Sequence, residues 1–245
     1  MIYKIIDENR KKGAKILLPL IDPDKFEEEQ LKYFENIDKN IVPFILIGGS
    51  LISSPIGPVV NSIKKHCNLP VVLYPGSPTH LTKEVDAVFL LSMISGRNPD
   101  LLIGHHVVAA PMIKQLNVET IPTGYMLIDG GSPTSVEYIS QTQPIPANKN
   151  DIAKATAMAG EMLGLKLIYM DAGSGAKWPI STDMISEVRK NIDIPLIIGG
   201  GVRDEAQAKR AFTAGADAII VGTAFEEDSD KIAAIVEMIR EINGQ

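Results

Sequence analysis

The sequence predicts a (β/α)8 barrel, or TIM barrel, an α/β fold in which parallel strands close into a sheet surrounded by helices. Eight apolar segments follow one another along the chain, and most are continuously apolar, as expected of strands buried on both faces. Helical patterns lie between most of these segments. The chain has 245 residues, close to the ~250 typical of such a barrel, and no domain boundary is visible, so residues 1–245 are predicted to form one domain.

The predicted strands are short, and several of them end at glycine. An open doubly wound sheet would be expected to carry a glycine-rich turn after its first strand. The first strand here ends in Leu20-Ile-Asp-Pro-Asp24 instead, which favours a closed barrel. In chain order, the predicted strands are Ala14–Asp22, Ile41–Ser50, Pro70–Gly76, Ala87–Met93, Glu119–Asp129, Lys166–Gly175, Pro195–Gly201 and Ala218–Thr223.

Helices are expected in most of the connections. Asp204 and Gly215 mark the start and the end of one of them, because these residue types are favoured at helix caps. Asp151–Gly164 is predicted to pack one apolar stripe against the barrel, formed by Ile152, Ala155, Ala159, Met162 and Leu163. Further helices are expected over Asp24–Ile37, Leu101–Leu116 and Ser181–Asn191, and from Ser229 onward.

The segment Gly130–Lys149 is the most irregular connection. It is rich in Gly, Pro, Ser, Thr and Asn, and its apparent apolar anchors are Val136 and Tyr138. A long connection after a barrel strand lies on the catalytic face, so this segment is predicted to be a lid or a binding loop.

The composition limits the classes of function. A net charge of −6 argues against a nucleic-acid partner or a general anionic-membrane surface, and 45% hydrophobic residues allow a large core. The single cysteine, Cys67, rules out an internal disulfide and is interpreted as a small core residue. No apolar run approaches the ~18 residues of a membrane span, and the polar segment Met1–Lys12 is no signal peptide, so a cytoplasmic protein is expected.

Two glycine-rich strand ends near the C-terminus predict a phosphate site. One is Ile194-Pro-Leu-Ile-Ile-Gly-Gly-Gly-Val202, and the other is Ala218-Ile-Ile-Val-Gly-Thr223. Glycine lets backbone N–H groups approach a ligand without a Cβ in the way. The loops after strands 7 and 8 of such barrels frequently bind phosphate, so the chain is expected to hold a phosphate there.

The sixth predicted strand ends in Tyr169-Met-Asp-Ala-Gly-Ser-Gly175. Tyr169 and Asp171 face the same way on a strand, which places a phenol and a carboxylate beside the phosphate site. That pair suits general-base catalysis on a hydroxyl. The alternative is that Asp171 is a buried carboxylate paired with Lys177 or Arg203. Gly173 and Gly175 flank Ser174, an arrangement typical of an anion-binding nest.

Asp22 follows an apolar run at the end of the first predicted strand, where a carboxylate is costly unless it meets a cation or hydrogen-bond donors. It is either a Mg²⁺ ligand, since Mg²⁺ is often held by one or two carboxylates and substrate phosphates, or the cap of the Asp24–Ile37 helix. Ser50 either completes the Mg²⁺ shell, binds phosphate or caps its own loop. His80 and Arg97 are further candidates for phosphate contact.

Strands 2 to 4 are unusually apolar near their ends. This surplus beside Gly/Ser/Pro loops suits a groove for a long apolar tail. The residues concerned are Leu51, Ile52, Ile56, Phe89, Leu91, Met93 and Ile94. The sequence has no zinc-ligand spacing, no Ser-His-Asp arrangement and no P-loop motif.

An ordered set of these segments resembles the geranylgeranylglyceryl phosphate synthase family, whose bacterial relatives include heptaprenylglyceryl phosphate synthases. The resemblance covers roughly residues 15–225. It is carried by Leu20-Ile-Asp-Pro-Asp-Lys25, Ile47-Gly-Gly-Ser50, Asn98-Pro-Asp-Leu-Leu-Ile-Gly-His-His106, Pro122-Thr-Gly-Tyr-Met-Leu-Ile-Asp-Gly-Gly131, Tyr169–Gly175, Ile197-Ile-Gly-Gly-Gly-Val202 and Val221-Gly-Thr223.

The resemblance implies Mg²⁺-dependent transfer of a polyprenyl group, with geranylgeranyl as the favoured chain, from its diphosphate to the 3-hydroxyl of sn-glycerol 1-phosphate. The product would carry the first ether bond of an ether lipid. The resemblance places Asp22 and Ser50 at the magnesium. Asp171 and Tyr169, the pair suited to general-base catalysis, are the predicted catalytic residues. The resemblance places the glycerol phosphate at Tyr169, Met170, Asp171, Ala172, Gly173, Ser174, Gly175, Gly200, Gly201, Gly222 and Thr223.

The chain departs from the family pattern at two positions. Asp171 stands where many members have Glu, so its carboxylate lies one methylene further back. Leu20 stands where other members have Lys, which places the chain with the longer-chain subgroup, in which larger assemblies occur. A homo-oligomer is therefore expected, together with transient contact between the site and a membrane surface for release of the lipid product.

Two other functions remain alternatives. A phosphosugar isomerase or synthase of the same fold would use the same phosphate site but would have no need of an apolar groove. A catalytically silent phosphate-binding barrel would need neither Asp22 nor Asp171.

Overall fold

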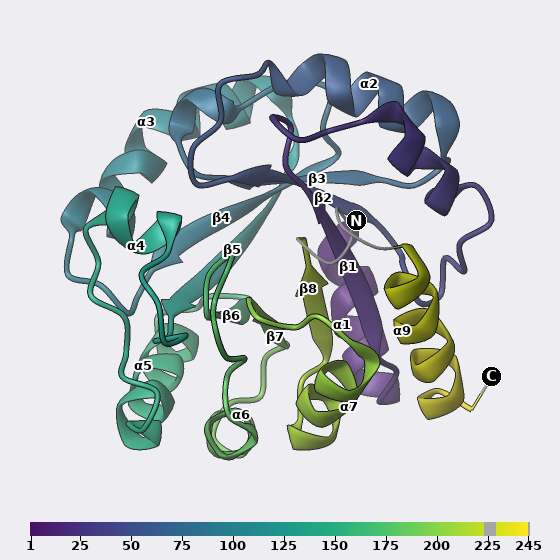
Figure 1. Cartoon of the computed structure of the whole chain (residues 1–245). Helices are drawn as coiled ribbons and strands as arrows, with labels where there is room; N and C mark the ends of the chain where they lie inside the picture. The colour runs from purple at the N-terminus through teal and green to yellow at the C-terminus, as the bar shows by residue number, and fades with distance from the viewer. Residues whose placement is uncertain (223–228, 245) are drawn as a thin grey trace.

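The computed structural model describes residues 1–222 and 229–244, and within them eight parallel strands close into a barrel in chain order (Figure 1). Each predicted strand is present, which confirms the (β/α)8 barrel. The ring closes between β1 and β8, where Ile16 pairs with Ala218 and Pro19 with Val221. The strands are β1 Ile16–Ile21, β2 Ile45–Gly49, β3 Val71–Pro75, β4 Ala87–Met93, β5 Glu119–Leu127, β6 Leu167–Asp171, β7 Leu196–Gly199 and β8 Ala218–Val221.

The later strands end sooner than the sequence predicted, because glycines turn the backbone at the barrel rim. β6 stops at Asp171, and Gly173 (φ 85°) and Gly175 (φ 79°) take left-handed conformations that glycine adopts without strain. β7 stops at Gly199, directly before Gly200 (φ 72°). Glycine turns therefore begin where the strands leave the barrel.

Helices cover the outside of the sheet (Figure 1). Asp204 accepts a 2.7 Å hydrogen bond from the Gln207 N–H at the start of α7, and Gly215 ends this helix, as predicted. Cys67 is buried at the end of α2, as expected. No helix in residues 1–222 and 229–244 is long and apolar enough to cross a membrane. The α-helices are α1 Ile2–Lys12, α2 Ile56–His66, α3 His105–Leu116, α4 Ser135–Ser140, α5 Asn150–Met162, α6 Thr182–Arg189, α7 Glu205–Ala214 and α9 Ser229–Ile242.

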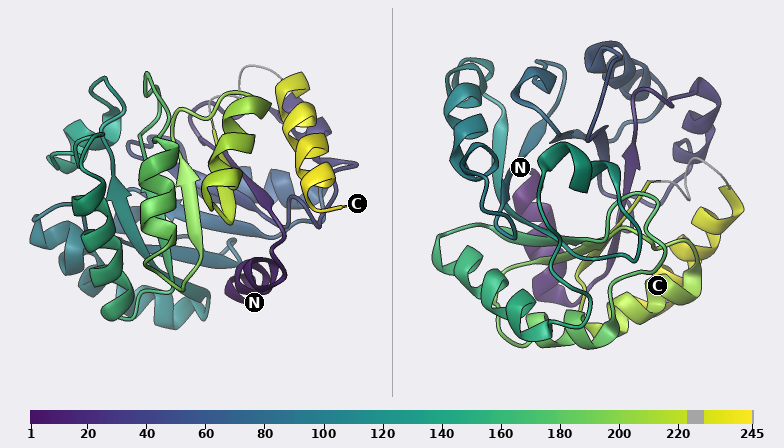
Figure 2. Two further views of the ribbon diagram at one scale, coloured as in Figure 1. Left: turned by 90° about the horizontal axis from the view of Figure 1, so that it is seen from below. Right: turned by 60° about the vertical axis from the view of Figure 1, so that its left-hand side comes forward.

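The first helix closes one end of the barrel. The buried apolar side chains inside the barrel form one cluster, here called the inner core. Ile2 and Ile6 of α1 belong to it together with Ile16 at the start of β1. The Glu119 carboxylate holds the start of this helix by accepting hydrogen bonds from the Ile2 and Tyr3 N–H groups. In the right-hand view of Figure 2, α4 lies in front of the barrel and α1 behind it. Because α1 closes one end of the barrel, a site can form only at the other end, where the carboxyl ends of the strands lie.

The predicted apolar stripe of α5 is wrong. The side of α5 that faces the barrel carries small residues, Ala153, Ala157 and Gly160. A Cβ at Gly160 would lie 2.8 Å from Cδ1 of Ile94, so the helix packs too closely for a large side chain there. The predicted stripe faces outward instead, and Met162 and Leu163 are each 79% exposed.

The predicted α-helix over Asp24–Ile37 is also wrong. This segment contains only a short 3-10 helix, η1 (Glu28–Phe34), which Glu27 caps. The Asp24 carboxylate instead accepts hydrogen bonds of 2.9 and 2.7 Å from the Ser53 and Ser54 N–H groups, which ties the segment to the loop after β2.

The segment between β5 and α5 is more regular than predicted. It contains the short helix α4, and Thr134 caps this helix by accepting a hydrogen bond from the Glu137 N–H. Val136 packs against the inner core as an anchor. Tyr138 is 83% exposed and is no anchor.

Candidate functional site

Two cavities open at the carboxyl ends of the strands. The first, here called the polar pocket, is bordered by the ends of β1, β2, β6, β7 and β8 and by α4. Its lining includes most of the predicted site residues together with two cationic side chains, Lys25 and Arg203. The predicted residues that line it are Asp22, Ser50, Tyr169, Asp171, Ser174, Gly175, Gly200, Gly201 and Gly222.

Asp171 lies at the base of the polar pocket and is only 7% exposed. The Tyr125 hydroxyl donates a 2.6 Å hydrogen bond to Oδ2, and the Gly173 N–H donates one of 2.7 Å to Oδ1. Burial raises the pKa of Asp171, and the hydrogen bonds from Tyr125, Gly173 and Tyr169 oppose that rise. The carboxylate is therefore desolvated and oriented, as a general base requires.

Three tyrosine rings surround this carboxylate. The ring of Tyr169 meets those of Tyr125 and Tyr74 edge to face, with centroid distances of 5.4 and 5.9 Å. Burial raises the pKa of all three phenols well above the usual value, so each keeps its proton, and those of Tyr125 and Tyr169 are available to hydrogen-bond Asp171. The sequence did not reveal the roles of Tyr74 and Tyr125. Tyr125 of β5 is paired with Tyr169 of β6, and this register aligns two of the rings. The register is known only once the strands are paired.

The alternative ion pair of Asp171 is not formed. Arg203 donates a 2.7 Å hydrogen bond from Nη2 to the Ala176 carbonyl. The Lys177 ammonium lies 4.5 Å from the ring centroid of Trp178. Among the described residues, Asp171 accepts hydrogen bonds from tyrosines and a backbone amide rather than from cations.

Not every residue of the predicted run Tyr169–Gly175 lines the polar pocket. Ser174 and Gly175 line the polar pocket. The Gly173 N–H is already bonded to Asp171, so it serves the carboxylate rather than a ligand. Met170 and Ala172 are buried in the second apolar cluster, here called the outer core, which lies between the sheet and the surrounding helices. They face away from the pocket because alternate residues of a strand face opposite sides.

The loops after β7 and β8 bring backbone close to the Asp171 carboxylate. A Cβ at Gly200 would lie 2.7 Å from Oδ1 of Asp171, so this glycine lets the two strand ends approach. Gly201 and Gly222 continue the same wall of the polar pocket. Thr223, also predicted here, lies outside the described residues.

Asp22 and Ser50 lie at the ends of the neighbouring strands β1 and β2, and both line the polar pocket. Asp22 Oδ1 accepts a 3.0 Å hydrogen bond from the Asp24 N–H. The capping alternative is wrong because no α-helix follows. A Cβ at Gly49 would lie 3.7 Å from Oδ2, so the glycine leaves room beside that oxygen.

No cluster of three or more His, Cys, Asp or Glu side chains suited to a metal exists among the described residues. A divalent ion at Asp22 would therefore rely on substrate oxygens for much of its shell, which fits Mg²⁺. The other phosphate candidates lie elsewhere. His80 accepts a hydrogen bond from the Gly76 N–H, and Arg97 donates a 2.6 Å bond to the Gly96 carbonyl.

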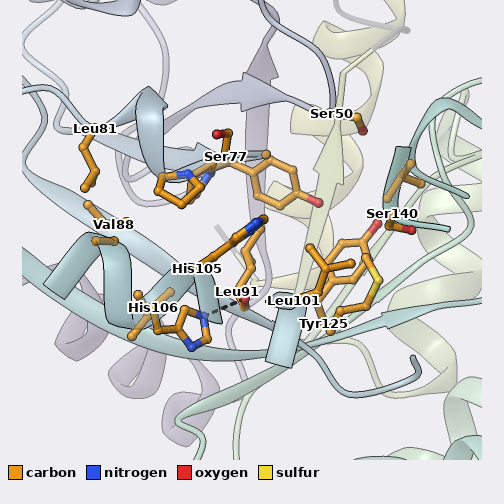
Figure 3. Close-up of a pocket in the computed structure, with 18 of the residues that line it drawn as sticks. Ser50, Ser77, Leu81, Val88, Leu91, Leu101, His105, His106, Tyr125 and Ser140 are labelled. Atoms are coloured by element: carbon orange, nitrogen blue, oxygen red, sulfur yellow. Dashed lines mark hydrogen bonds between the residues drawn. The ribbon is translucent and has the colours of Figure 1, made fainter. Parts of the chain in front are cut away.

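The second cavity, here called the apolar groove, runs between β3, β4 and α3. Figure 3 shows Leu81, Val88, Leu91 and Leu101 around it, with His106 hydrogen-bonded to the Leu91 carbonyl. Of the residues predicted for such a groove, Leu91 and Met93 line it. The others do not: Leu51 lines the polar pocket, Phe89 is in the inner core, and Ile52, Ile56 and Ile94 belong to or pack against the outer core.

The two cavities meet. Gly49, Ser50, Tyr74 and Val136 line both of them. The site can therefore hold a molecule with an apolar tail and a polar head, with the head beside Asp22 and the tail along β4. A second, small polar molecule fits against the glycine loops and Asp171.

Comparison with known proteins agrees with this geometry. Residues 6–239 match the model of the PcrB family. The chain is 47% identical to the geranylgeranylglyceryl phosphate synthase of Chitinophaga pinensis, over 97% of this chain and 95% of the relative. It is 45% identical to the enzyme of that name from Spirosoma linguale, over 98% and 97% of the two chains.

A solved structure is similar over the whole barrel. It is (S)-3-O-geranylgeranylglyceryl phosphate synthase from Thermoplasma acidophilum in complex with sn-glycerol-1-phosphate, with a TM-score of 0.89, 30% identity and 97% of each chain covered. The chain therefore belongs to the PcrB family, and its relationship to geranylgeranylglyceryl phosphate synthases confirms both the resemblance and the prenyltransferase class that the sequence predicted.

Proposed function

We propose that this protein joins a polyprenyl diphosphate, with geranylgeranyl as the favoured chain, to the 3-hydroxyl of sn-glycerol 1-phosphate. The observation that carries the proposal is the junction between the apolar groove and the polar pocket at Gly49, Ser50, Tyr74 and Val136. A prenyl diphosphate has a long apolar tail and a charged head, and this pair of cavities accommodates both. The relative from Thermoplasma acidophilum binds the proposed acceptor, which supports this choice.

The acceptor fits the side of the polar pocket formed by β6, β7 and β8. Its phosphate would lie against Gly200, Gly201 and Gly222, with the Arg203 guanidinium nearby. Its free hydroxyl would then face Asp171. As the hydroxyl oxygen attacks C1 of the prenyl group, its proton passes to the carboxylate, which the Tyr125 hydroxyl holds in place.

The donor diphosphate fits the side of the polar pocket formed by β1 and β2. Asp22 and Ser50 would hold Mg²⁺ there together with diphosphate oxygens. When bound, the ion would neutralise charge on the departing diphosphate. The Lys25 side chain adds positive charge to the same wall. The four residues shared by both cavities position the tail so that C1 lies between diphosphate and acceptor.

The surface supports the proposed assembly into a homo-oligomer. Apolar side chains are exposed on α3 and α5, two helices on the outside of the barrel. Burying these side chains against a second copy would remove apolar surface from water. They are Val107, Val108, Met112, Ile152 and Met162. We also propose a cytoplasmic location, with transient membrane contact during product release.

A product assay tests the proposed function. Purified protein is incubated with Mg²⁺, labelled glycerol 1-phosphate of either configuration, and farnesyl, geranylgeranyl or heptaprenyl diphosphate. A prenyl ether formed from sn-glycerol 1-phosphate supports the proposal. Isomerisation of a phosphosugar without any prenyl donor would favour the alternative enzyme, and phosphate binding without turnover would favour the silent barrel.

A further inference from the structure

The three tyrosines around Asp171 differ in the cavities that they line. Tyr125 lines the apolar groove alone, and Tyr169 lines the polar pocket alone. Tyr74 lines both. Of the three rings, the Tyr74 ring is therefore the one at the boundary where the tail and the head of an extended amphiphilic substrate are joined.

The packing around Tyr74 fixes the ring at this boundary. Its backbone lies beside Gly48 of β2, where a Cβ would come within 1.8 Å of the Tyr74 carbonyl oxygen. Its ring meets that of Tyr169 at an interplanar angle of 81° and that of Tyr125 at 53°. The residue is 9% exposed, so the small exposed part is the part that faces the cavities.

The proposed reaction creates positive charge at this boundary. C1 of the donor carries the diphosphate on one side and the apolar tail on the other, so it must lie where the two cavities meet. When the bond between C1 and the diphosphate oxygen breaks, its electron pair leaves with the diphosphate and C1 becomes an allylic cation. An aromatic face attracts a cation, most strongly in a site from which water is excluded.

We propose that the ring of Tyr74 stabilises the allylic cation at the junction of the apolar groove and the polar pocket, and that Tyr74 is thus a catalytic residue. This inference rests on the proposed prenyl transfer. The cation is consumed when the 3-hydroxyl oxygen of glycerol 1-phosphate bonds to C1 and its proton moves to Asp171. The ring lowers the barrier without gaining or losing an atom, and this effect is separate from the hydrogen bonds of the Tyr74 hydroxyl with Tyr125 and Tyr169.

Substitution separates the ring from the hydroxyl. Tyr74→Phe keeps the ring and should lower kcat much less than Tyr74→Leu does. Tyr74→Leu keeps an apolar side chain but loses the ring, and should lower kcat by about tenfold to thirtyfold, the range expected for a desolvated cation–π contact. The KM values for both substrates should change little, because the charge exists only during the reaction.

A fluorination series keeps the test decisive even if Tyr74→Leu does not fold. Phenylalanine carrying one, two or three ring fluorines is placed at position 74, since each fluorine withdraws charge from the ring face with little change in shape. The matched control is the same series at Phe89, which lies in the same inner core but lines neither cavity. The logarithm of kcat should fall steadily with fluorine number at position 74 and stay level at position 89.

Two results would overturn the assignment. One is a kcat that is insensitive to fluorination at position 74 in an enzyme that forms the prenyl ether. The other is an equal fall at positions 74 and 89, which would indicate a packing effect. A wild-type protein that forms no prenyl ether would instead overturn the proposed function, so the two failures are distinguishable.

Discussion

The Tyr125 hydroxyl donates a 2.6 Å hydrogen bond to Oδ2 of Asp171. The two residues lie on adjacent strands, 46 residues apart in the sequence, and the β5–β6 pairing brings them together. A neutral phenol that donates to a buried carboxylate favours its charged form without cancelling its charge. The arrangement therefore holds Asp171 ready to accept a proton, where an ion pair would have occupied it.

The first prediction is that Asp171→Asn lowers kcat by about 10²–10⁴-fold, the usual contribution of a positioned general base. Asparagine has nearly the same shape but does not accept the hydroxyl proton. Binding of glycerol 1-phosphate, measured by calorimetry, should be nearly unchanged. Asp129→Asn is the matched control, since Asp129 follows the neighbouring strand and lines neither cavity. Loss of binding or of folding in Asp171→Asn would point to a structural role instead.

The second prediction concerns pH. Burial already raises the pKa of Asp171, and the hydrogen bond from Tyr125 opposes that rise. Tyr125→Phe removes the opposing hydrogen bond, so the pKa of Asp171 should rise further. Because the base works only when deprotonated, the acidic limb of the kcat–pH profile should move to higher pH. An unmoved limb would mean that a different group controls the acidic side of the profile.

The third prediction concerns the phosphate site. A Cβ at Gly222 would have Leu20 O, at 3.6 Å, as its nearest neighbour, so Gly222→Val should fold while placing methyl groups in the polar pocket. The KM for glycerol 1-phosphate should rise at least about tenfold, and the KM for the prenyl diphosphate much less. Steady-state kinetics with each substrate varied in turn measures both. Equal effects would show that this wall is not dedicated to the acceptor.

The fourth prediction concerns the length of the prenyl chain. Ala109 is the smallest side chain that α3 contributes to the apolar groove, so Ala109→Trp should obstruct it. kcat/KM for geranylgeranyl diphosphate should fall at least about tenfold relative to farnesyl diphosphate. Ala110→Trp is the matched control, because Ala110 is exposed on the same helix and lines neither cavity. An unchanged preference in Ala109→Trp would mean that the tail binds elsewhere.

Much of the fold follows from local sequence signals. Continuous apolar runs indicated the buried strands, and Asp204 and Gly215 marked the limits of α7. The prediction for the α5 stripe was wrong because close packing at Gly160 requires small residues on the face toward the barrel. Hydrophobic periodicity favours the more apolar face of a helix, so it did not identify an inner face made of small residues. The helix predicted over residues 24–37 was wrong because the Asp24 carboxylate accepts hydrogen bonds from Ser53 and Ser54, which are distant in the sequence.

The site was predicted in part for a similar reason. Site residues at strand ends, such as Asp22, Asp171 and Gly200, could be predicted from the sequence because all carboxyl ends of a parallel barrel meet at one face. The tyrosine cluster depends on cross-strand register, which only the closed sheet determines. The true floor of the apolar groove depends on α3, whose groove-facing residues Ala109 and Ile113 carry no separate signal.

The most direct test of the central claim follows the acceptor oxygen through the reaction. The protein is incubated with Mg²⁺, geranylgeranyl diphosphate and sn-glycerol 1-phosphate labelled with oxygen-18 at the 3-hydroxyl, and the products are analysed by mass spectrometry. The account predicts a prenyl ether that retains the label, unlabelled diphosphate, and loss of both products in Asp22→Ala, which lacks the proposed Mg²⁺ ligand. An absence of labelled ether from the wild-type protein, or full activity in Asp22→Ala, would contradict it.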